Sequence, residues 1–285
     1  MILVADSGST KCDWIPIRAE GELEKQSTVG FNPYFCDEQF VVEGIKANSF
    51  LYDHRQQVTH VFFYGAGCSS DDRKALVARG LSQVFTSAEI KVDHDVFASA
   101  LATCGDHAGI ACILGTGSNS CYFDGKKVYT NNYGLGYIMG DEGSGSYLGK
   151  KLITHYLYGI LPEPIKSAFE ARYKMDKEVM IEHVYSKPGG NVWLASFAKF
   201  LSEFPDDPWV KNTVQKGFEE FFDLYVCGYP DFRSTEVHFV GSIAHYFEPV
   251  LREVGASRSA NVVKVIRHPV KGLADYYRAK FFQNQ

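Results

Sequence analysis

One short pattern occurs twice in this chain, and it restricts the fold more than any other feature of the sequence. Ser7-Gly8-Ser9-Thr10-Lys11-Cys12 can be laid over Thr116-Gly117-Ser118-Asn119-Ser120-Cys121 without a gap, at an offset of 109 residues. In both copies a hydrophobic strand is expected to enter a turn rich in Gly, Ser and Thr, and a cysteine-bearing strand to leave it. Equivalent turns in the two halves of a chain indicate a duplicated domain, with a cleft between the copies.

The stretches around these turns alternate between strand-like and helix-like patterns. Strands are expected at residues 2–5, 12–17, 58–64, 89–92, 109–114, 121–123, 127–130, 236–240 and 262–266. Helices are expected at residues 37–52 and 70–85, across most of 142–228, over about 243–254 and from about 270 onward. Asp124-Gly125 predicts a hairpin between two of the strands. The alternation predicts an α/β fold in which helices cover the faces of the sheets.

Length and composition exclude several classes of protein. The chain has 285 residues, enough for two domains, and 45% of them are hydrophobic, as in a globular protein with a substantial core. The net charge of −5 gives no general attraction for nucleic acid or an anionic membrane. No apolar run approaches the roughly 20 residues of a membrane-spanning helix. The segment Met1–Asp6 resembles a first strand more than a signal peptide, so a cytoplasmic location is expected.

Several common site motifs are missing. The seven cysteines include no Cys-x-x-Cys pair and the nine histidines no His-Glu-x-x-His arrangement, which disfavours a disulfide framework, a four-sulfur zinc site and a metal hydrolase. Gly149-Lys150-Lys151 lacks the Ser or Thr that a P-loop needs after its lysine. No Gly-x-Gly-x-x-Gly fingerprint follows the first strand, so a dinucleotide-binding fold is also disfavoured.

The repeated turns have the composition of a phosphate site. Glycine, serine and threonine expose backbone N–H groups and hydroxyls at short range, and glycine lets a ligand approach the backbone closely. Two such turns facing one another could hold the β- and γ-phosphates of a nucleotide from both sides. Each turn taken alone is better explained as an ordinary hairpin turn, so the pair at matching positions is what favours phosphate binding.

Two further glycine-containing segments stand out. The run from Gly134 to Gly149 includes Asp141, and a loop that approaches a ligand closely while offering a carboxylate has this composition. A helix cap would explain Asp141 but not the glycines before it. Gly241-Ser242 lies between an expected strand and an expected helix. Such a junction can bind an adenine ring or a ribose-phosphate edge, or it can simply allow tight packing of the strand on the helix.

Taken together, these segments resemble the sugar-kinase, Hsp70 and actin superfamily, and within it the BadF/BadG/BcrA/BcrD-type ATPases, the group that contains eukaryotic-type N-acetylglucosamine kinase. Their order and the chain length extend the resemblance over nearly the whole sequence, although each short motif alone is unspecific. The motifs that carry it are Asp6-Ser7-Gly8-Ser9-Thr10-Lys11, Gly115-Thr116-Gly117-Ser118-Asn119, Gly140-Asp141-Glu142-Gly143-Ser144 and Gly241-Ser242.

The resemblance implies two ribonuclease-H-like (actin-like ATPase) domains, with ATP and Mg²⁺ in the cleft between them. The first domain would comprise residues 1–104 and a C-terminal helix, 271–285, that packs back on it. The second would comprise residues 105–270 and include a helical insertion. An amino-sugar substrate and a homodimer are implied as well.

The resemblance also assigns roles to individual residues. Asp6 would hold the Mg²⁺ shell through water. The nucleotide would be bound by Gly8, Ser9, Thr10, Lys11, Gly115, Thr116 and Gly117 at its phosphates and by Gly241 and Ser242 beside its adenosine. The sugar would be bound by Asn32, Asp95, Ser118, Asn119, Gly136 and Asp141.

The catalytic base is expected after the last strand of the first domain. Asp95 fits the family pattern, because a small residue and a serine follow it at three and four positions. The two residues between are bulkier than the usual alanines, so the alignment could slip, and Asp93 is the rival. Asp95 is also placed to cap a helix that begins at Val96. As the base it would accept the proton of the attacking sugar hydroxyl, the one at carbon 6.

The expected function is therefore an ATP-dependent kinase of an amino sugar, with N-acetylglucosamine as the first choice. One alternative is an ATPase that activates a dehydratase or reductase, but Cys112 lies inside a strand and not at the helix start that its iron–sulfur cluster would need. Another is a non-catalytic nucleotide- or sugar-binding module, against which the carboxylates of Asp6, Asp95 and Asp141 argue. A zinc-containing ROK-type sugar kinase would need a Cys-x-Cys-Gly-x-x-Gly-Cys cluster, which the sequence lacks.

Overall fold

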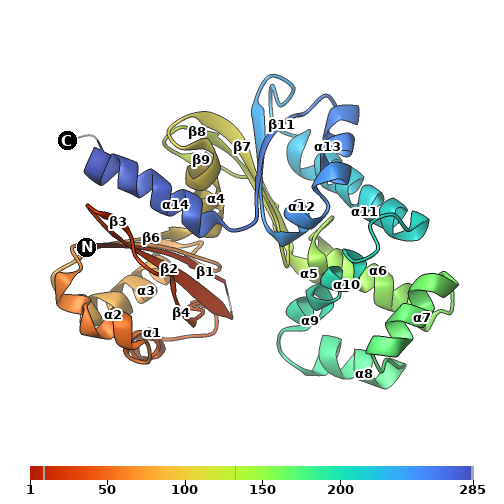
Figure 1. Ribbon diagram of the computed structural model, residues 1–285, viewed down its shortest axis with the longest axis horizontal. Coiled ribbons are helices and arrows are strands. Elements are labelled where there is room, and N and C mark those ends of the chain that lie inside the picture. The colour runs from red at the N-terminus through yellow and green to blue at the C-terminus, as the bar shows by residue number, and fades with distance from the viewer. Residues whose placement is uncertain (9, 132, 284–285) are drawn as a thin grey trace. The chain divides into compact units, whose positions relative to one another are not determined.

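The computed structural model describes residues 1–8, 10–131 and 133–283, and the chain divides into two compact units (Figure 1). Unit 1 comprises Met1–His107, the hairpin tip Gly125–Lys127 and His268–Gln285. Unit 2 comprises Ala108–Asp124 and Val128–Arg267. Each unit is built around one mixed sheet, and the α/β class expected from the alternating patterns is confirmed.

The sheet of unit 1 has the order β3-β2-β1-β5-β6, and β4 pairs with β2. Strands β1 and β2 form an antiparallel hairpin, whereas β5 and β6 run parallel to β1, so the carboxyl ends of β1, β5 and β6 meet at one edge. The strands are β1 (Ile2–Ser7), β2 (Lys11–Arg18), β3 (Gly21–Glu22), β4 (Gln26–Val29), β5 (His60–Gly65) and β6 (Glu89–His94).

Helices cover both faces of this sheet. Because side chains alternate along a strand, Phe63 of β5 points into the core beneath α1 and α3, while Phe62 points to the other face and stacks on Tyr277 of α14. On that second face Gly272 of α14 packs against Ala102 of α4. The helices of unit 1 are α1 (Glu38–Lys46), α2 (Ser49–Asp53), η1 (Arg55–Gln57), α3 (Asp71–Val84), α4 (Asp95–Cys104), α14 (Pro269–Arg278) and η4 (Ala279–Gln283).

The sheet of unit 2 repeats this connectivity. Its order is β11-β10-β7-β8-β9, with β7 and β8 antiparallel and with β10 and β11 parallel to β7. In this order β7, β8, β10 and β11 correspond to β1, β2, β5 and β6 of unit 1, which supports the duplication inferred from the turns. The strands are β7 (Ala108–Leu114), β8 (Ser118–Asp124), β9 (Val128–Tyr129), β10 (Glu236–Val240) and β11 (Asn261–Ile266).

The gapless overlay of the two turns is wrong in register. Ser7 pairs with Cys12 across the first turn, whereas Leu114 pairs with Ser118 across the second. Thr116, which the overlay aligns with the strand residue Ser7, therefore lies inside the second turn. The two turns are equivalent in topology but differ in length, so their residues do not match one for one.

Helices of unit 2 surround a single large apolar core that includes Leu148, Phe218 and Phe239. They are α5 (Gly136–Met139), α6 (Gly145–Leu157), α7 (Glu163–Arg172), α8 (Lys177–Ile181), η2 (Glu182–Ser186), α9 (Gly190–Ser196), α10 (Ala198–Leu201), α11 (Pro208–Phe221), η3 (Phe222–Val226), α12 (Ser242–Tyr246) and α13 (Glu248–Ser257). The largely helical character expected for 142–228 is confirmed.

Two expected helices are each divided in two. The helix expected over 37–52 is interrupted at Asn48, which adopts an extended conformation and caps α2 by accepting a hydrogen bond from the Leu51 N–H at 3.0 Å. The helix expected over 243–254 is interrupted at Phe247, and Pro249 lies in the first turn of the new helix, α13. Across the part of the chain that the structure describes, no helix combines the length and the apolar character needed to span a bilayer.

Close packing of α6 on α9 gives a stability prediction. A methyl group at Gly149 would overlap the carbonyl oxygen of Leu194, a backbone atom that cannot move aside without shifting α9. Gly149→Ala should therefore lower the free energy of unfolding by about 2 kcal/mol, as measured by urea denaturation. Lys151→Ala, in the same helix, is the control and should change it by less than about 0.5 kcal/mol. Equal stability of the two variants would contradict the packing.

Candidate functional site

In unit 1 the candidate residues gather at the edge where the parallel strands end. The strand register places Asp6 of β1 beside Tyr64 of β5, and Tyr64 beside Asp93 of β6. Asp95 follows directly as the first residue of α4. The sequence separates these carboxylates by almost ninety residues, and the parallel strand order brings them to one edge.

Asp6 is held in an environment that disfavours its charge. Its pKa is raised to about 7, first by burial and then by the negative charges of Asp95 and Asp13. No hydrogen bond or ion pair of its carboxylate is found among the described residues. Carboxylate oxygens with free lone pairs are ligands that Mg²⁺ accepts, and a divalent cation here would offset the repulsion, so Asp6 fits the metal role expected of it.

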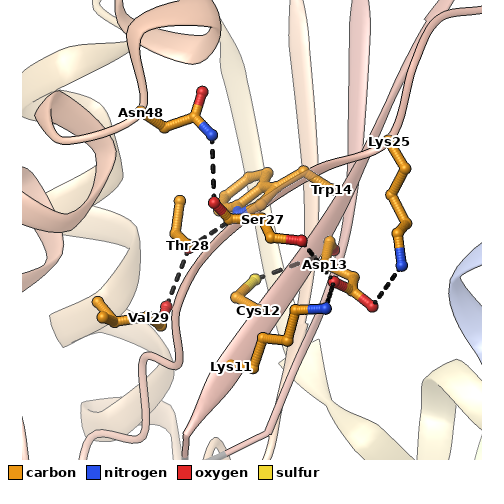
Figure 2. Close-up of polar contacts among 9 residues, drawn as sticks. All are labelled: Lys11, Cys12, Asp13, Trp14, Lys25, Ser27, Thr28, Val29 and Asn48. Atoms are coloured by element: carbon orange, nitrogen blue, oxygen red, sulfur yellow. Dashed lines mark hydrogen bonds and ion pairs between the residues drawn. The ribbon is translucent and has the colours of Figure 1, made fainter.

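Asp13 faces Asp6 across the β1–β2 hairpin but has a different environment (Figure 2). Its carboxylate pairs with the ammonium groups of Lys11 at 2.9 Å and Lys25 at 3.1 Å, and accepts a hydrogen bond from Ser27 at 2.8 Å. Burial alone would raise the pKa of Asp13, but these three partners lower it below its ordinary value. Lys11, expected at the nucleotide phosphates, is thus ion-paired to Asp13 in the ligand-free chain, with its side chain largely exposed.

The two rival bases differ in their partners. Asp93 forms an ion pair with Lys74, with 2.6 Å between the Lys74 Nζ and Asp93 Oδ1 atoms. The Asp95 carboxylate has no cationic partner within the described chain, and its Oδ1 accepts a hydrogen bond from the Val96 N–H at 2.9 Å. Burial is the main reason that the pKa of Asp95 is raised to about 6, near the range where a carboxylate accepts protons efficiently at neutral pH.

The capping role expected for Asp95 is wrong. The N-cap of α4 is His94, whose Nδ1 accepts a hydrogen bond from the Phe97 N–H at 3.2 Å, and the helix begins at Asp95 itself. Histidine is not among the preferred capping residues, so the propensity argument selected the neighbouring aspartate. The carboxylate of Asp95 contacts the first turn of α4 only at the adjacent Val96 N–H and does not cap the helix.

Asn32 is buried, and its segment is fixed both to the end of β1 and within its own turn. The Phe31 N–H donates to the Ser7 hydroxyl at 2.9 Å, and the Asn32 Oδ1 accepts a hydrogen bond from the Tyr34 N–H at 3.0 Å. Gly67, after β5, has a φ of +84°, and any side chain there would overlap Asn32 Oδ1. Glycine at 67 is thus required by the close approach of Asn32.

The first turn is only partly described. The Gly8 N–H donates to the Lys11 carbonyl at 2.9 Å, and Gly8 and Thr10 are exposed. Ser9, expected at the nucleotide phosphates, lies outside the described residues.

In unit 2 the second turn lines a pocket of about 230 Å³. Gly115 and Thr116 border it, and their carbonyl groups accept hydrogen bonds from the first N–H groups of α6, at Gly145 and Ser146, at 2.8 and 3.0 Å. Ser242 borders the same pocket, so three of the residues expected at the nucleotide come together. The full lining is Gly115, Thr116, Gly145, Val192, Ala195, Ser196, Ser242 and Ile243.

The sequence interpretation missed part of this pocket. Val192, Ala195 and Ser196 belong to α9, and nothing in their local sequence distinguishes them from other helix residues. Gly241 does not line the pocket but allows it to form. Its φ is +131°, and a side chain there would overlap the Leu114 carbonyl, so glycine lets β10 pass directly beside the end of β7.

The expected sugar residues of unit 2 form a second group around Asp141. This buried residue has a φ of +61°, which is uncommon for a residue with a side chain. Its Oδ1 accepts a hydrogen bond from the Ser118 N–H at 3.2 Å, and its Oδ2 would lie 2.9 Å from a Cβ at Gly117. Burial raises the pKa of Asp141. The N-cap of α6 is Ser144, so capping does not explain Asp141.

Three other expected residues differ in their surroundings. The Ser118 hydroxyl is buried and has no hydrogen-bond partner within the described chain. The Asn119 Oδ1 accepts from the Ser120 N–H at 2.8 Å, and its Nδ2 would lie 3.1 Å from a Cβ at Gly134. Gly136 begins α5 with a φ of +77°, and a Cβ there would meet no described atom within 4 Å. Only Ser118 among them offers an unused buried polar atom.

The raised pKa of Asp6 gives a prediction for the protein without ligands or divalent cations. The folded chain holds a proton on Asp6 more tightly than the unfolded chain, so the free energy of unfolding should fall as the pH rises from 3.8 to about 7. Asp6→Asn removes the buried charge and should raise the unfolding temperature at pH 8 by about 2 °C or more, but not at pH 4. Asp13→Asn removes a well-paired charge and should lower it at pH 8. An Asp6→Asn variant less stable than the wild type at pH 8 would contradict this.

No protein-family model and no curated protein matches the chain, but solved structures do. A candidate N-acetylglucosamine kinase of Porphyromonas gingivalis is 37% identical, with a TM-score of 0.92, and the match covers 98% of this chain and 99% of that one. A candidate N-acetylglucosamine kinase of Chromobacterium violaceum is 17% identical over 96% of this chain and 98% of that one, with a TM-score of 0.68. A ROK-family glucokinase of Streptomyces griseus, solved with glucose and AMPPNP, is 15% identical over 96% and 98%, with a TM-score of 0.55. These last two matches concern the fold alone.

Proposed function

Because this chain belongs to the sugar kinases with an actin-like ATPase fold, the family of its P. gingivalis relative, we propose that it transfers the γ-phosphoryl group of ATP to an amino sugar. We propose N-acetylglucosamine as the sugar and its 6-hydroxyl as the acceptor. The name of the relative supports the sugar, and the position on the ring rests on the resemblance of the motifs. A homodimer and a cytoplasmic location stay predictions.

The observation that carries the proposal is the pair of carboxylates at the strand edge of unit 1. Asp6 has no hydrogen-bond or ion-pair partner within the described residues and a pKa raised to about 7. Asp95 has only backbone partners for its carboxylate and a pKa of about 6. If this edge of the sheet had only a structural role, two carboxylates whose charged forms are disfavoured by burial would not be expected there. These properties suit Asp6 as a group that binds near a cation and Asp95 as a group that accepts a proton.

In the proposed reaction Asp95 accepts the proton of the attacking hydroxyl as the oxygen approaches phosphorus. The raised pKa makes Asp95 a stronger base than an exposed aspartate, and at neutral pH most of it is still ionised. Asn32, fixed by its contacts with Tyr34 and Gly67, orients the sugar beside it. A Mg²⁺ ion attended by Asp6 would supply positive charge to the phosphate oxygens during transfer.

The residues of unit 2 are proposed to bind the other parts of the reactants. Thr116 and Ser242 border the pocket for the nucleotide, whose backbone wall is fixed by the hydrogen bonds to α6. The unpartnered hydroxyl of Ser118 and the carboxylate of Asp141 are available to sugar hydroxyls. Positioning of this kind, and not covalent chemistry, accounts for most of the acceleration in phosphoryl transfer.

No observation favours the iron–sulfur alternative. Cys112 is fully buried within β7, and no cluster of three or more metal-ligating side chains is found in the described ranges.

The substrate is tested by measuring ADP release with Mg²⁺ and ATP over a panel of sugars. N-acetylglucosamine should give the highest kcat/KM, ahead of glucosamine, N-acetylmannosamine and glucose, and NMR of the product should place the phosphate on carbon 6. Release of ADP that no sugar stimulates would contradict the kinase assignment.

Asp95→Asn tests the base. The amide cannot accept the proton, so kcat should fall by at least about 10²-fold while the affinity for ATP stays within about twofold. Asp93→Asn is the matched control, because Asp93 is already paired with Lys74, and its kcat should fall by less than about fivefold. A large loss in Asp93→Asn with an unaltered rate in Asp95→Asn would transfer the role to Asp93.

A further inference from the structure

Unit 2 contains a second cavity that the proposed reaction does not use. Its volume is about 360 Å³, larger than the pocket at Thr116 and within the usual range for small-molecule sites. It lies between α5, the second half of α6, α8, η2 and α9. None of the residues with an expected nucleotide or sugar role lines it.

The interior of this cavity is apolar. Ile153 and Leu194, both almost fully buried, belong to the core of unit 2, while Leu157, Met180 and Val184 are partly buried beside them. Val184 lies in η2, a π-helical turn, and its carbonyl accepts a weak hydrogen bond from the Tyr137 hydroxyl at 3.4 Å. Such turns are rare and often occur at functional sites.

Large apolar side chains are exposed around the opening. Ile138, Tyr158 and Tyr185 line the cavity with exposures of 73, 76 and 77%. Single exposed hydrophobic residues are ordinary on a protein surface, but several around one cavity mark a binding surface.

The cavity holds one charged group, Lys150 of α6. Its ammonium donates to the Tyr137 carbonyl at 3.1 Å. Its charge also acts on Asp141, outside the lining, but no ion pair joins Lys150 to a carboxylate within the described chain. An ammonium has three donors, so two remain for a ligand. No acidic residue lines the cavity, and Thr154 adds a hydroxyl. The charge of the lining is thus entirely positive.

From this lining we propose that the cavity binds a small apolar carboxylate, with its hydrocarbon part against Ile153 and Leu194 and its carboxylate on Lys150. Charge complementarity selects this ligand over a neutral apolar one, because an ammonium beside an apolar wall with no carboxylate in the lining forms its strongest hydrogen bonds with an anion. The apolar walls select it over an inorganic anion such as phosphate.

The probe is octanoate, titrated into the full-length protein without nucleotide or sugar and followed by calorimetry. The wild type should bind octanoate at least tenfold more tightly than octanamide, its neutral analogue. Lys150→Met keeps the stem and removes the charge, and it should weaken octanoate binding at least tenfold while leaving octanamide binding within about twofold. Lys151→Met is the matched control, because the Lys151 ammonium lies over the ring of Tyr147 and does not line the cavity, and it should bind octanoate like the wild type.

A second variant tests the location. Thr154→Phe places a ring in the cavity and should abolish binding of both probes, with circular dichroism showing that the fold is retained. If Thr154→Phe fails to fold, the comparison of octanoate binding by Lys150→Met and Lys151→Met still tests the proposal. Octanoate binding that none of the variants changes, or no binding by the wild type, would overturn the proposal. So would a dimer that Tyr185→Ser converts to monomer, since the cavity would then be a face between copies of the chain.

Discussion

The carboxylates of Asp6 and Asp95, both half-buried, lie at one edge of the sheet of unit 1, because the parallel strands β1, β5 and β6 end there. Burial raises the pKa values of both Asp6 and Asp95, and the negative charge of Asp95 raises that of Asp6 further. Neither carboxylate has a basic partner in the part of the chain that the structure describes. Asp13, which pairs with Asp6 in the β1–β2 hairpin, is by contrast stabilised as a charged group by two lysines and a serine. The contrast supports the proposal that Asp6 attends a cation and that Asp95 accepts a proton.

Glycine at contact points lets the rest of the site form. The absence of a side chain at Gly67 leaves room for Asn32, and at Gly117 it leaves room for Asp141. Gly241 likewise allows the end of β10 to lie against the end of β7. At each of these positions a Cβ would meet a backbone atom or a functional side chain, so the glycines are explained by packing as well as by turn conformation. Among these glycines, Gly117 belongs to the second repeated turn, so there the residue that suggested phosphate binding is also required for packing.

Local sequence patterns were sufficient for the fold class and for most strands, because hydrophobic runs end at Gly, Ser or Asp where the strands end. They failed where a single side chain decided the outcome, as when Asn48 capped a new helix and His94 replaced Asp95 as the cap of α4. The register of the second turn also could not be read from residue identity. Ala195 and Ser196 reach their pocket only through the packing of α9 on α6, which has no local signal. The roles of the site residues stay predictions.

Asp6 and Asp95 are destabilised as charged groups, and the proposed reaction uses both for that reason. This destabilisation is tested most directly by following the ¹³C chemical shifts of the aspartate carboxyl groups against pH, with Asp6→Asn and Asp95→Asn providing the assignments. Without divalent cations we expect midpoints of about 7 for Asp6 and about 6 for Asp95. Added Mg²⁺ with ADP should lower the midpoint of Asp6. Midpoints near the ordinary aspartate value of 3.8 for both residues would contradict the account.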